Sequence, residues 1–373
     1  MKTIALVAGA RPNFMKIAPL VRALRNHDGA LRVQIVHTGQ HYDPDMNDVF
    51  FEELGIPRPD VCLDAGSGTH AQQLAKIMVA FETFCRAGHP DLVVVVGDVN
   101  STMACTVVAK QQRIPVAHVE AGLRSRDMTM PEELNRILTD AIADLLFVTE
   151  PSGVENLLRE GKRPETVHHV GHVMVDNLLY QLERLTGSDT SRYVSTGIRA
   201  RYPRYGAVTL HRPSNVDEPQ VFARLSSALR EVSRELPLVF PLHPRTRANL
   251  EKFGIDLGSA VTLTPPLSFM DFLGLWKDAA VVLTDSGGLQ EETTALGVPC
   301  LTLRETTERP ITVDEGTNQV VGTDPACICD AVQRVLRGEG KQGRRPALWD
   351  GHASERIAGI LRRELGAAAS SRS

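Results

Sequence analysis

Residues 92–100 read Leu-Val-Val-Val-Val-Gly-Asp-Val-Asn. An apolar run of this length, rich in valine, predicts a strand buried on both faces, which is typical of a parallel sheet. The run ends at Gly97, and the polar residues Asp98 and Asn100 follow. Similar runs recur along the chain and alternate with amphipathic stretches such as residues 70–85. This alternation predicts βα units and therefore an α/β fold.

Each half of the chain contains a set of such strands. We expect them at residues 3–8, 32–37, 92–96, 115–118 and 145–148, and then at residues 206–210, 238–242, 261–264, 280–284 and 299–303. The sequence therefore predicts two doubly wound domains, in keeping with 373 residues, since one domain usually holds about 100 to 200. A further strand is expected to end at Val170, and the expected domain boundary follows it, which gives domains 1–170 and 171–352. The last helical segment, 353–365, could pack on either domain.

Composition excludes several classes of protein. The net charge is −4, so no overall positive field attracts nucleic acid or an anionic membrane. Six cysteines without a CxxC pair argue against a zinc ribbon or a disulfide framework, and favour a reducing compartment. No apolar stretch approaches the roughly 18 residues of a membrane span, and the apolar run at the N-terminus is too short for a signal peptide. We therefore expect a cytoplasmic protein.

Polar residues directly follow the expected strands, at the edge where open α/β sheets bind ligands. Three carboxylates, Asp98, Glu120 and Glu132, follow strand ends or open a helix in the first half, and His211 follows a strand in the second. If a cleft closes between the domains, acid–base groups of one would meet phosphate-binding groups of the other. Alternatively, Asp98 is a turn residue, Glu132 complements a helix dipole, and Glu120 forms a salt bridge with Arg124.

The segment 285–292 predicts a strand, a glycine turn and a helix start. Free N–H groups at such a helix start bind anions, the Ser286 hydroxyl adds a donor, and Glu292 could accept hydrogen bonds from sugar hydroxyls. Alternatively, Ser286 is an ordinary N-cap. Four basic residues could neutralise a diphosphate, although each alone could equally be a surface residue: Arg11, Lys16, Arg212 and Arg309.

Two further patterns do not predict cofactor sites. Residues 66–71 fit the dinucleotide pattern G-x-G-x-x-A, but they do not follow the first strand, so we expect no nicotinamide cofactor. His37 and His41 have the i, i+4 spacing of a metal site, as do His168 and His172, yet both pairs straddle strand ends rather than share a helical face. We therefore expect no metal.

Motifs in chain order closely resemble those of the non-hydrolysing UDP-N-acetylglucosamine 2-epimerases. They are Gly9-Ala10-Arg11-Pro12 with Lys16-Ile17-Ala18-Pro19, Gly97-Asp98, His118 to Arg124, Pro131 to Arg136, Thr284 to Glu292, and Thr306 to Pro310 with Gly316-Thr317. The resemblance implies two Rossmann-like domains in a glycosyltransferase B-type arrangement with an interdomain active-site cleft. It also implies a homodimer, and a C-terminal helix, 353–366, that packs back on the first domain.

The resemblance implies a reaction as well. The C2 proton of an N-acetylhexosamine is not next to a carbonyl, which disfavours direct deprotonation, whereas UDP on C1 is an excellent leaving group. The family is understood to eliminate UDP, giving a 2-acetamidoglucal, and to add UDP back after protonation on the other face. UDP-GlcNAc and UDP-ManNAc are thereby interconverted, and no cofactor is required.

Site residues follow from the same resemblance. Asp98, Glu120 and Glu132 resemble the carboxylates that move the C2 proton and stabilise oxocarbenium character, and His211 resembles the group that assists at the phosphate or leaving oxygen. Phe272 resembles the position that lies against uracil. The residues expected to bind the rest of UDP are Arg11, Lys16, Arg212, His243, Ser286, Gly287, Gly288, Glu292 and Arg309.

Three departures from the commoner bacterial pattern leave the substrate and its activation open. Asn13 stands where glutamate is usual after Arg-Pro. Pro213-Ser214-Asn215 follows His211-Arg212, where Arg-Glu is usual. Residues 40–46 lack the tight Gln-His-x-x-Met associated with a second, activating UDP-sugar. Relatives act on 2,3-diacetamido uronic acid sugars or release N-acetylmannosamine by hydrolysis. A UDP-sugar sensor without activity and a glycosyltransferase are the alternatives from other functional classes.

Overall fold

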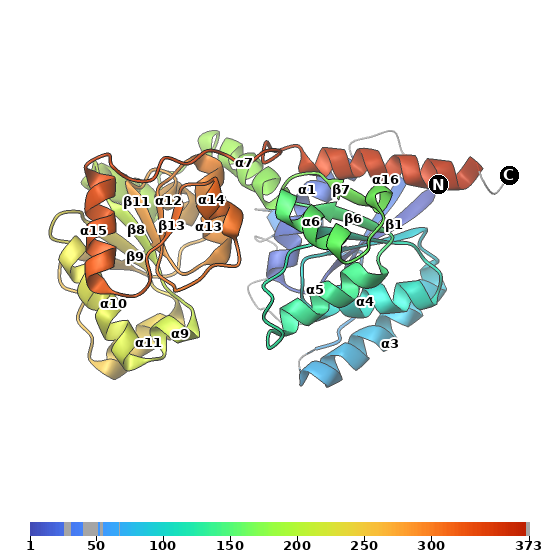
Figure 1. Cartoon of the computed structure of the whole chain (residues 1–373), viewed down its shortest axis with the longest axis horizontal. Coiled ribbons are helices and arrows are strands. Elements are labelled where there is room, and N and C mark those ends of the chain that lie inside the picture. The colour runs from blue at the N-terminus through green and yellow to red at the C-terminus, as the bar shows by residue number, and fades with distance from the viewer. Residues whose placement is uncertain (26–30, 40–50, 53–54, 67, 371–373) are drawn as a thin grey trace. The chain divides into compact units, whose positions relative to one another are not determined.

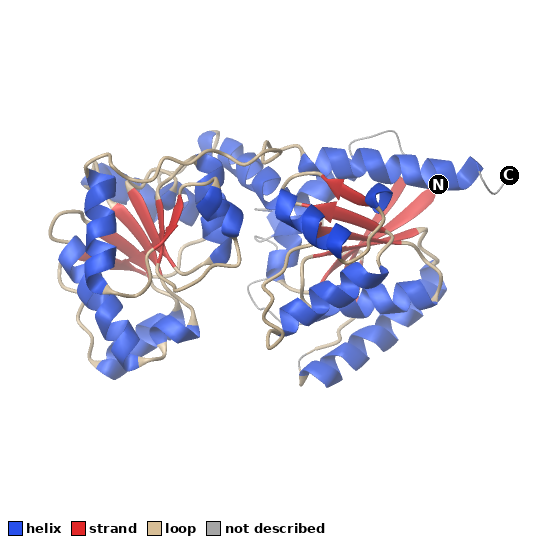
Figure 2. Ribbon diagram, in the orientation of Figure 1, coloured by secondary structure: helices blue, strands red, loops and turns tan. Residues whose placement is uncertain are grey.

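The computed structural model describes residues 1–25, 31–39, 51–52, 55–66 and 68–370. Its chain divides into two units, Met1–Tyr180 with Ala347–Ser373, and Gln181–Pro346. Each unit is a parallel sheet with helices on both faces (Figures 1 and 2), which confirms the predicted pair of Rossmann-like α/β domains. The position expected for the boundary, Val170, lies inside unit 1. The helix that follows it begins at Val173, whose side chain is part of the unit 1 core.

The sheet of unit 1 has the strand order β3-β2-β1-β4-β5-β6-β7. The strands are β1 (Lys2–Ala8), β2 (Leu31–His37), β3 (Val61–Cys62), β4 (Leu92–Val96), β5 (Val116–Ala121), β6 (Leu145–Val148) and β7 (Val167–His169). The order reverses between β1 and β4, so the carboxyl ends of these two strands flank the position where such sheets bind ligands.

The sheet of unit 2 has the equivalent order β10-β9-β8-β11-β12-β13. Its strands are β8 (Gly206–Thr209), β9 (Leu238–Pro241), β10 (Val261–Thr264), β11 (Val281–Thr284), β12 (Cys300–Thr302) and β13 (Asn318–Val320). The reversal here lies between β8 and β11. All ten of these strands are present, β7 is the strand expected to end at Val170, and β3 and β13 are additional short strands.

The helices follow the strands in the expected alternation. Unit 1 holds α1 (Arg11–Arg25), α3 (His70–Gly88), α4 (Asn100–Gln111), α5 (Pro131–Ile142), α6 (Pro151–Arg159), the first part of α7 (Val173–Thr186) and α16 (Ala353–Ser370). Unit 2 holds the rest of α7, α8 (Val194–Arg201), α9 (Pro213–Val216), α10 (Pro219–Val232), α11 (Pro244–Phe253), α12 (Phe269–Trp276), α13 (Gly287–Leu296), α14 (Pro310–Asp314) and α15 (Pro325–Leu336).

Strand β4 shows why the quoted apolar run decides the fold. Leu92, Val94 and Val96 pack in the core that includes α1 and α16, whereas Val93 and Val95 pack in the core on α3 and α4. Each side chain is at most 2% exposed. Burial of one such side chain stabilises the fold by about 1.5–3 kcal/mol. The sheet is therefore a rigid support for the polar turns at its carboxyl edge.

The C-terminal helix packs on unit 1. Ile357 and Leu361 of α16 are fully buried in the same core as α1. The carboxylate of Asp176 in α7 accepts hydrogen bonds from the backbone N–H groups of Ala353 and Ser354, at 3.1 and 2.6 Å, and thereby caps the start of α16. The helix continues to Ser370, four residues beyond the end expected at residue 366.

The G-x-G-x-x-A pattern of residues 66–71 has a structural explanation. Residues 68–71 form the cap of α3, where the Thr69 side chain accepts from the backbone of Gln72 and the Gln72 side chain accepts from the backbone of Thr69.

His41 lies outside the described residues, as does the segment 40–46. In the described part of the chain, no three His, Cys, Asp or Glu side chains are grouped as metal ligands, and no helix is long and apolar enough to cross a membrane.

Candidate active site

Asn13 joins the two strand ends that flank the reversal point of unit 1. Its buried side-chain oxygen accepts from the N–H groups of Gly9 and Ala10 after β1, at 3.1 and 3.0 Å. Its amide nitrogen donates to the carbonyl of Val96 at the end of β4, at 3.2 Å. This position needs both a donor and an acceptor, which an amide supplies and an ionised glutamate does not. The structure thus gives a reason for asparagine at this position.

Glu120 lies at the end of β5 and forms an ion pair with Lys16 of α1. The side chains of Glu120 and Lys16 are only 3% and 13% exposed. Glu120 has a φ of 71°, and the pairing of β5 with β6 shifts register next to it. A non-glycine residue in the left-handed region costs energy and persists only where its surroundings enforce it, which occurs most often at functional sites.

Gly97 leaves the space that Lys16 occupies. It has a φ of 67°, and a Cβ atom there would lie 2.7 Å from the ammonium nitrogen of Lys16. Arg124, the alternative partner considered for Glu120, instead pairs with Asp140 at 2.7 Å and with Glu160 at 2.6 Å. The expected alternative of a Glu120–Arg124 salt bridge is therefore wrong.

Asp98 is held by Arg136 of α5. The guanidinium donates to one carboxylate oxygen of Asp98 at 3.1 and 2.7 Å, and to Glu133 at 2.7 Å. Burial would raise the pKa of Glu133, but hydrogen bonds from the backbone of Ser125 and Arg126, together with Arg136, keep its pKa below the usual range. Asp98 is therefore part of a charged network rather than only a turn residue. Arg136 and Glu133 were not among the predicted site residues.

Glu132 opens α5 beside this network, with its side chain exposed. Arg11 is likewise exposed, at the first position of α1. The structure therefore brings together Lys16 with Glu120, and Asp98 with Arg136, at the carboxyl edge of the first sheet. Glu132 and Arg11 lie at the same edge, since both open a helix that follows a strand.

In unit 2, Asp285 joins the two strand ends at the reversal point. It follows β11 and is fully buried. Its carboxylate accepts from the backbone N–H groups of His211 and Arg212 after β8, and lies 3.0 Å from Nδ1 of His211. Burial would raise the pKa of Asp285, but these bonds and the charge of His211 keep its pKa below the usual range. With Nδ1 turned to Asp285, the 44% exposed His211 side chain presents its other ring nitrogen outward.

Arg212 is engaged by a second acidic residue. Its guanidinium donates to Glu308 at 2.6 Å and to the backbone carbonyl of Asp285 at 3.1 Å. Arg304 approaches the other oxygen of Glu308 at 2.8 Å. Burial acts to raise the pKa of Glu308, but the two arginines overcome it and lower this pKa to about 2. Arg212 is therefore fixed in place by Glu308, which the sequence analysis did not single out.

The start of α13 lies next to Glu308. Ser286 occupies the N-cap position of α13, as the alternative expected, but in the described part of the chain its hydroxyl makes no capping hydrogen bond to the helix. A Cβ atom on Gly287 would lie 3.0 Å from Glu308. The first N–H groups of a helix have no partners within it, so this start is suited to an anion. Glu292 is half-buried one turn further on.

The remaining predicted residues lie at the same edge of the second sheet. Arg309 precedes α14 and pairs with Glu291 at 2.8 Å. His243 caps α11, with Nδ1 accepting from the backbone N–H of Arg245 at 3.3 Å, and its side chain is exposed. Phe272 lies half-buried on α12. The predicted residues thus form two groups, one at the carboxyl edge of each sheet.

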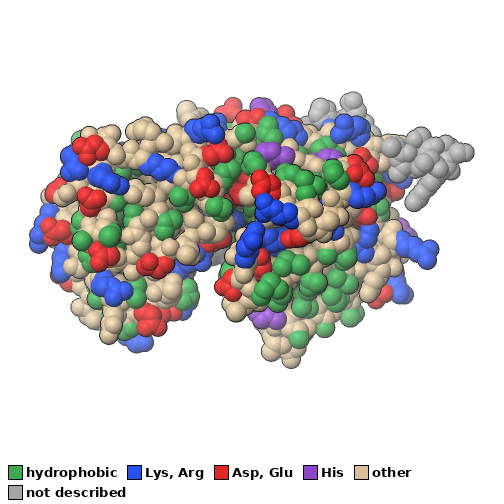
Figure 3. All heavy atoms as spheres, viewed as in Figure 1, with side chains coloured by type: hydrophobic (Ala, Val, Ile, Leu, Met, Phe, Trp, Pro, Cys, Tyr) green, Lys and Arg blue, Asp and Glu red, His purple; other side chains and the backbone are tan. Residues whose placement is uncertain are grey.

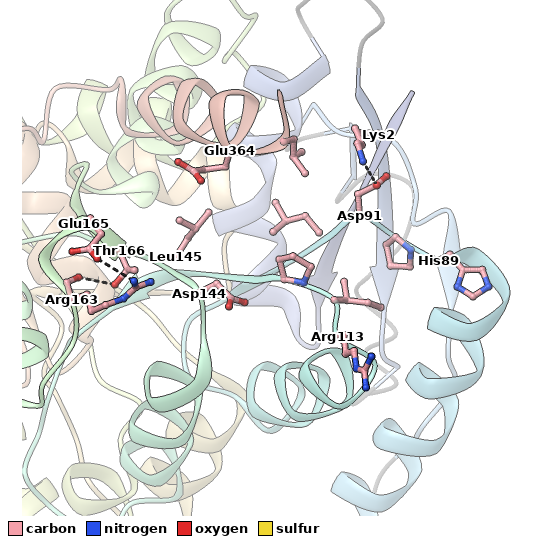
Figure 4. Close-up of a pocket in the computed structure, with 15 residues that line it drawn as sticks. Lys2, His89, Asp91, Arg113, Asp144, Leu145, Arg163, Glu165, Thr166 and Glu364 are labelled. Carbon is pink, nitrogen blue, oxygen red and sulfur yellow. Dashed lines mark hydrogen bonds and ion pairs between the residues drawn. The ribbon is translucent and has the colours of Figure 1, made fainter. Parts of the chain in front are cut away.

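A pocket of about 620 Å³ lies at the opposite edge of the first sheet (Figure 4). It is lined where β1, β4, β5 and β6 begin, and Lys2 there pairs with Asp91 at 2.8 Å. None of the predicted site residues lines it. Ligands of doubly wound sheets bind at the carboxyl edge, so we assign the active site to that edge and not to this pocket.

Comparisons with known proteins identify the family of this chain. Residues 22–362 match the family model described as UDP-N-acetylglucosamine 2-epimerase. The chain is 38% identical to the UDP-N-acetylglucosamine 2-epimerase of Methanocaldococcus jannaschii, over 96% of this chain and 98% of the relative. It is also 38% identical to the UDP-2,3-diacetamido-2,3-dideoxy-D-glucuronate 2-epimerase of Pseudomonas aeruginosa, over 97% of this chain and 99% of the relative.

A solved structure shows the same fold. The crystal structure of the Methanocaldococcus jannaschii UDP-GlcNAc 2-epimerase in complex with UDP-GlcNAc and UDP matches with a TM-score of 0.84 at 37% identity. The match covers 97% of this chain and 99% of that one. This chain therefore belongs to the UDP-N-acetylglucosamine 2-epimerase family.

Proposed function

We propose that this protein reversibly epimerises UDP-N-acetylglucosamine at C2 of the sugar, giving UDP-N-acetylmannosamine. The observation that supports this most is the Glu120–Lys16 pair, a buried carboxylate on left-handed backbone at the ligand-binding edge of its sheet. The neighbouring turn supplies Asp98, fixed by Arg136. Such carboxylates can remove a proton from one face of a sugar ring and deliver a proton to the other face.

The proposed chemistry is elimination followed by addition. A carboxylate among Asp98, Glu120 and Glu132 takes the C2 proton while the C1–O bond breaks, and the bonding electrons leave with UDP. The resulting 2-acetamidoglucal is protonated at C2 on the opposite face, and UDP adds back to C1. Lys16 keeps Glu120 oriented and balances its charge. The electrons that leave C1 return to it, so the reaction has no net redox change.

Unit 2 is proposed to bind UDP. The first N–H groups of α13, at Gly287 and Gly288, together with the Ser286 hydroxyl, would bind phosphate oxygens. His211 would act at the leaving oxygen through the ring nitrogen that faces away from Asp285. The proposed contacts to the rest of UDP are Arg11, Lys16, Arg212, His243, Phe272, Glu292 and Arg309.

A second substrate is favoured by one observation. Identity to the diacetamido-glucuronate 2-epimerase equals that to the Methanocaldococcus enzyme, at 38% each. The second candidate function is therefore the same C2 epimerisation on a UDP-linked 2,3-diacetamido uronic acid. Competition between the two UDP-sugars in one assay, with kcat/KM obtained for each, identifies the preferred substrate.

The proposed reaction is tested by NMR spectroscopy of the purified protein with UDP-GlcNAc in deuterated water. We expect UDP-ManNAc to form and deuterium to enter C2. Free N-acetylmannosamine would show hydrolysis instead. Binding without isotope exchange would show a sensor, and transfer to an added acceptor without change at C2 would show a glycosyltransferase. Any of these three results contradicts the proposal.

We further propose that the protein is a homodimer. Leu134, Leu138 and Ile142 form an exposed stripe along α5, with 42%, 49% and 38% of each residue accessible. Val79 on α3 is 66% exposed, and apolar side chains gather over α5 and α4 on the surface (Figure 3). An exposed apolar patch of this kind is typical of a protein interface. The family resemblance supports a second copy of the chain as the partner.

The dimer is tested by analytical ultracentrifugation of Leu138→Glu. We expect the wild type to sediment as a dimer and Leu138→Glu as a monomer, because a buried charge without a partner disfavours the interface. Leu158→Glu is the control, since Leu158 on α6 is similarly exposed, at 43%, but lies outside this stripe. A monomeric wild type, or a dimeric Leu138→Glu, contradicts the proposal.

A further inference from the structure

His118 and Asp140 are hydrogen-bonded to each other inside unit 1. Nδ1 of His118 lies 2.6 Å from Asp140, and both side chains are 0% exposed. Nε2 of His118 lies 2.8 Å from the backbone carbonyl oxygen of Gly97. Neither residue belongs to the proposed acid–base group, although both lie close in sequence to residues that do.

The hydrogen bonds fix the orientation of the ring. A carbonyl oxygen only accepts, so Nε2 of His118 donates to Gly97, and Nδ1 faces the carboxyl group of Asp140. Burial acts to raise the pKa of Asp140, but His118 and Arg124 lower the pKa of this carboxyl below its usual value.

Arg124 anchors the Asp140 end of the pair. From α5, Asp140 also accepts from Arg124 at 2.7 Å, and Arg124 pairs further with Glu160 at 2.6 Å. A buried carboxylate needs such partners, because desolvation of an unpaired charge costs several kcal/mol.

The pair is bonded to both turns that present the proposed catalytic carboxylates. Its His118 end holds the carbonyl of Gly97, directly before Asp98. Its Asp140 end accepts from the N–H of Gly122 at 3.0 Å, two residues after Glu120. Gly122 has a φ of 81° and touches the backbone of α6, where a Cβ atom would lie 2.4 Å from the carbonyl oxygen of Gly153. The turn after Glu120 is thereby held on two sides.

We infer that the His118–Asp140 pair is a positioning device, which sets the spacing of Asp98 and Glu120 for reaction at C2. This inference rests on the proposed function. An error of about 1 Å in the placement of reacting groups can lower the rate about 100-fold, so such a device affects turnover without touching the substrate.

The positioning role is tested with a matched pair of variants, Asp140→Asn and Asp144→Asn. Asp144 also binds a basic side chain, Lys110 at 2.6 Å, and a backbone N–H of β5, Val116 at 2.8 Å. It holds the amino end of β5, far from the proposed site, whereas Asp140 holds the carboxyl end. The two variants therefore make the same chemical change at opposite ends of one strand.

We expect Asp140→Asn to lower kcat roughly 10- to 100-fold while the KM for UDP-GlcNAc changes less than about threefold. Asp144→Asn is expected to keep both within about twofold. Equal losses in the two variants, or a change confined to KM, would overturn the positioning role. The wild type separates the two proposals: a wild type that does not epimerise UDP-GlcNAc contradicts the proposed function, whereas an active wild type with equal losses in the two variants contradicts only the positioning role.

Discussion

Each unit holds a histidine–aspartate pair at the carboxyl edge of its sheet, and the two pairs differ in what the second ring nitrogen meets. In unit 1, His118 and Asp140 are both fully buried, and the other ring nitrogen is bonded to Gly97. In unit 2, Asp285 is buried but the His211 side chain is 44% exposed. The same two residue types thus hold backbone in place in unit 1 and orient a histidine ring toward solvent in unit 2.

The difference shows how a site can divide its tasks. A ring with both nitrogens engaged cannot exchange protons with a ligand, so its contribution is geometric. A ring bonded at Nδ1 alone has a defined tautomer and a second nitrogen that can reach a substrate. In the proposed function, the acid–base carboxylates lie in unit 1 beside buried charged residues, and His211 of unit 2, proposed to act at the leaving oxygen, is exposed.

The largest effect is expected at Glu120. Glu120→Gln preserves the shape of the side chain but removes the charge that would accept a proton, so we expect turnover to fall by about 100-fold or more. The measurement is the initial rate of epimerisation followed by NMR spectroscopy. Glu155→Gln is the control, because Glu155 forms an exposed pair with Arg159 on α6 and should leave turnover within about twofold. Turnover of Glu120→Gln near that of the wild type would make this carboxylate merely structural.

The two histidines should separate activity from stability. We expect His211→Gln to lower kcat by roughly 100-fold and to leave the free energy of unfolding nearly unchanged. His118→Gln should lower the free energy of unfolding of unit 1 by about 3–5 kcal/mol, because it leaves Asp140 buried with one partner fewer.

Tryptophan fluorescence can measure the free energy of unfolding of each unit separately. Trp349 is buried in unit 1 and Trp276 in unit 2, and they are the only two tryptophans of the chain. Variants that retain one tryptophan each therefore report denaturant unfolding of each unit. If His211→Gln destabilises unit 2 as strongly as His118→Gln destabilises unit 1, the contrast between the two pairs is wrong.

A smaller effect, on the stability of unit 2, is expected when a fall in pH protonates Glu308. The pKa of this carboxyl is about 2 in the folded protein, below its ordinary value of 4.5. A lowered folded-state pKa contributes stability that is present above 4.5 and is lost as pH falls toward about 2. Denaturant midpoints of unit 2 should therefore drop across this window in the wild type, and drop less in Glu308→Gln. Glu339→Gln, at an exposed pair with Arg337, should match the wild type; equal curves for all three would contradict the assignment.

The smallest effect is expected at Ser286. Ser286→Ala removes one hydroxyl donor from the proposed phosphate site, and a single such hydrogen bond is worth about 0.5–1.5 kcal/mol. The KM for UDP-GlcNAc should rise roughly 2- to 10-fold with kcat almost unchanged. Ser191→Ala, at an exposed position of unit 2, should alter neither constant. A loss in kcat alone would place Ser286 with the reacting groups rather than with UDP.

The fold was predictable because its strands are buried on both faces. Runs such as residues 92–96 need no partner to be recognised, and the expected strands are present. The strands β3 and β13 were missed for a physical reason. The first has only two residues, and the second, Asn318–Val320, begins with a polar residue and is half-buried at the sheet edge.

The site was predictable only in part, because a single sequence shows positions but not partners. Residues just after strands could be identified, whereas Arg136 and Asp140 lie 38 and 22 positions from the groups they hold. Asp285 was within the quoted glycine turn, yet its bond to His211 spans 74 positions. The same limit explains Arg212: it was expected to neutralise phosphate, and the structure shows Glu308, 96 positions away, already bonded to it.

The most direct test of the central claim is the fate of the C2 hydrogen of UDP-GlcNAc in deuterated water. Elimination and re-addition at carboxylates that exchange protons with solvent predict deuterium at C2 of both UDP-GlcNAc and UDP-ManNAc as equilibrium is approached. Epimerisation that retains protium at C2 in the product would contradict this account.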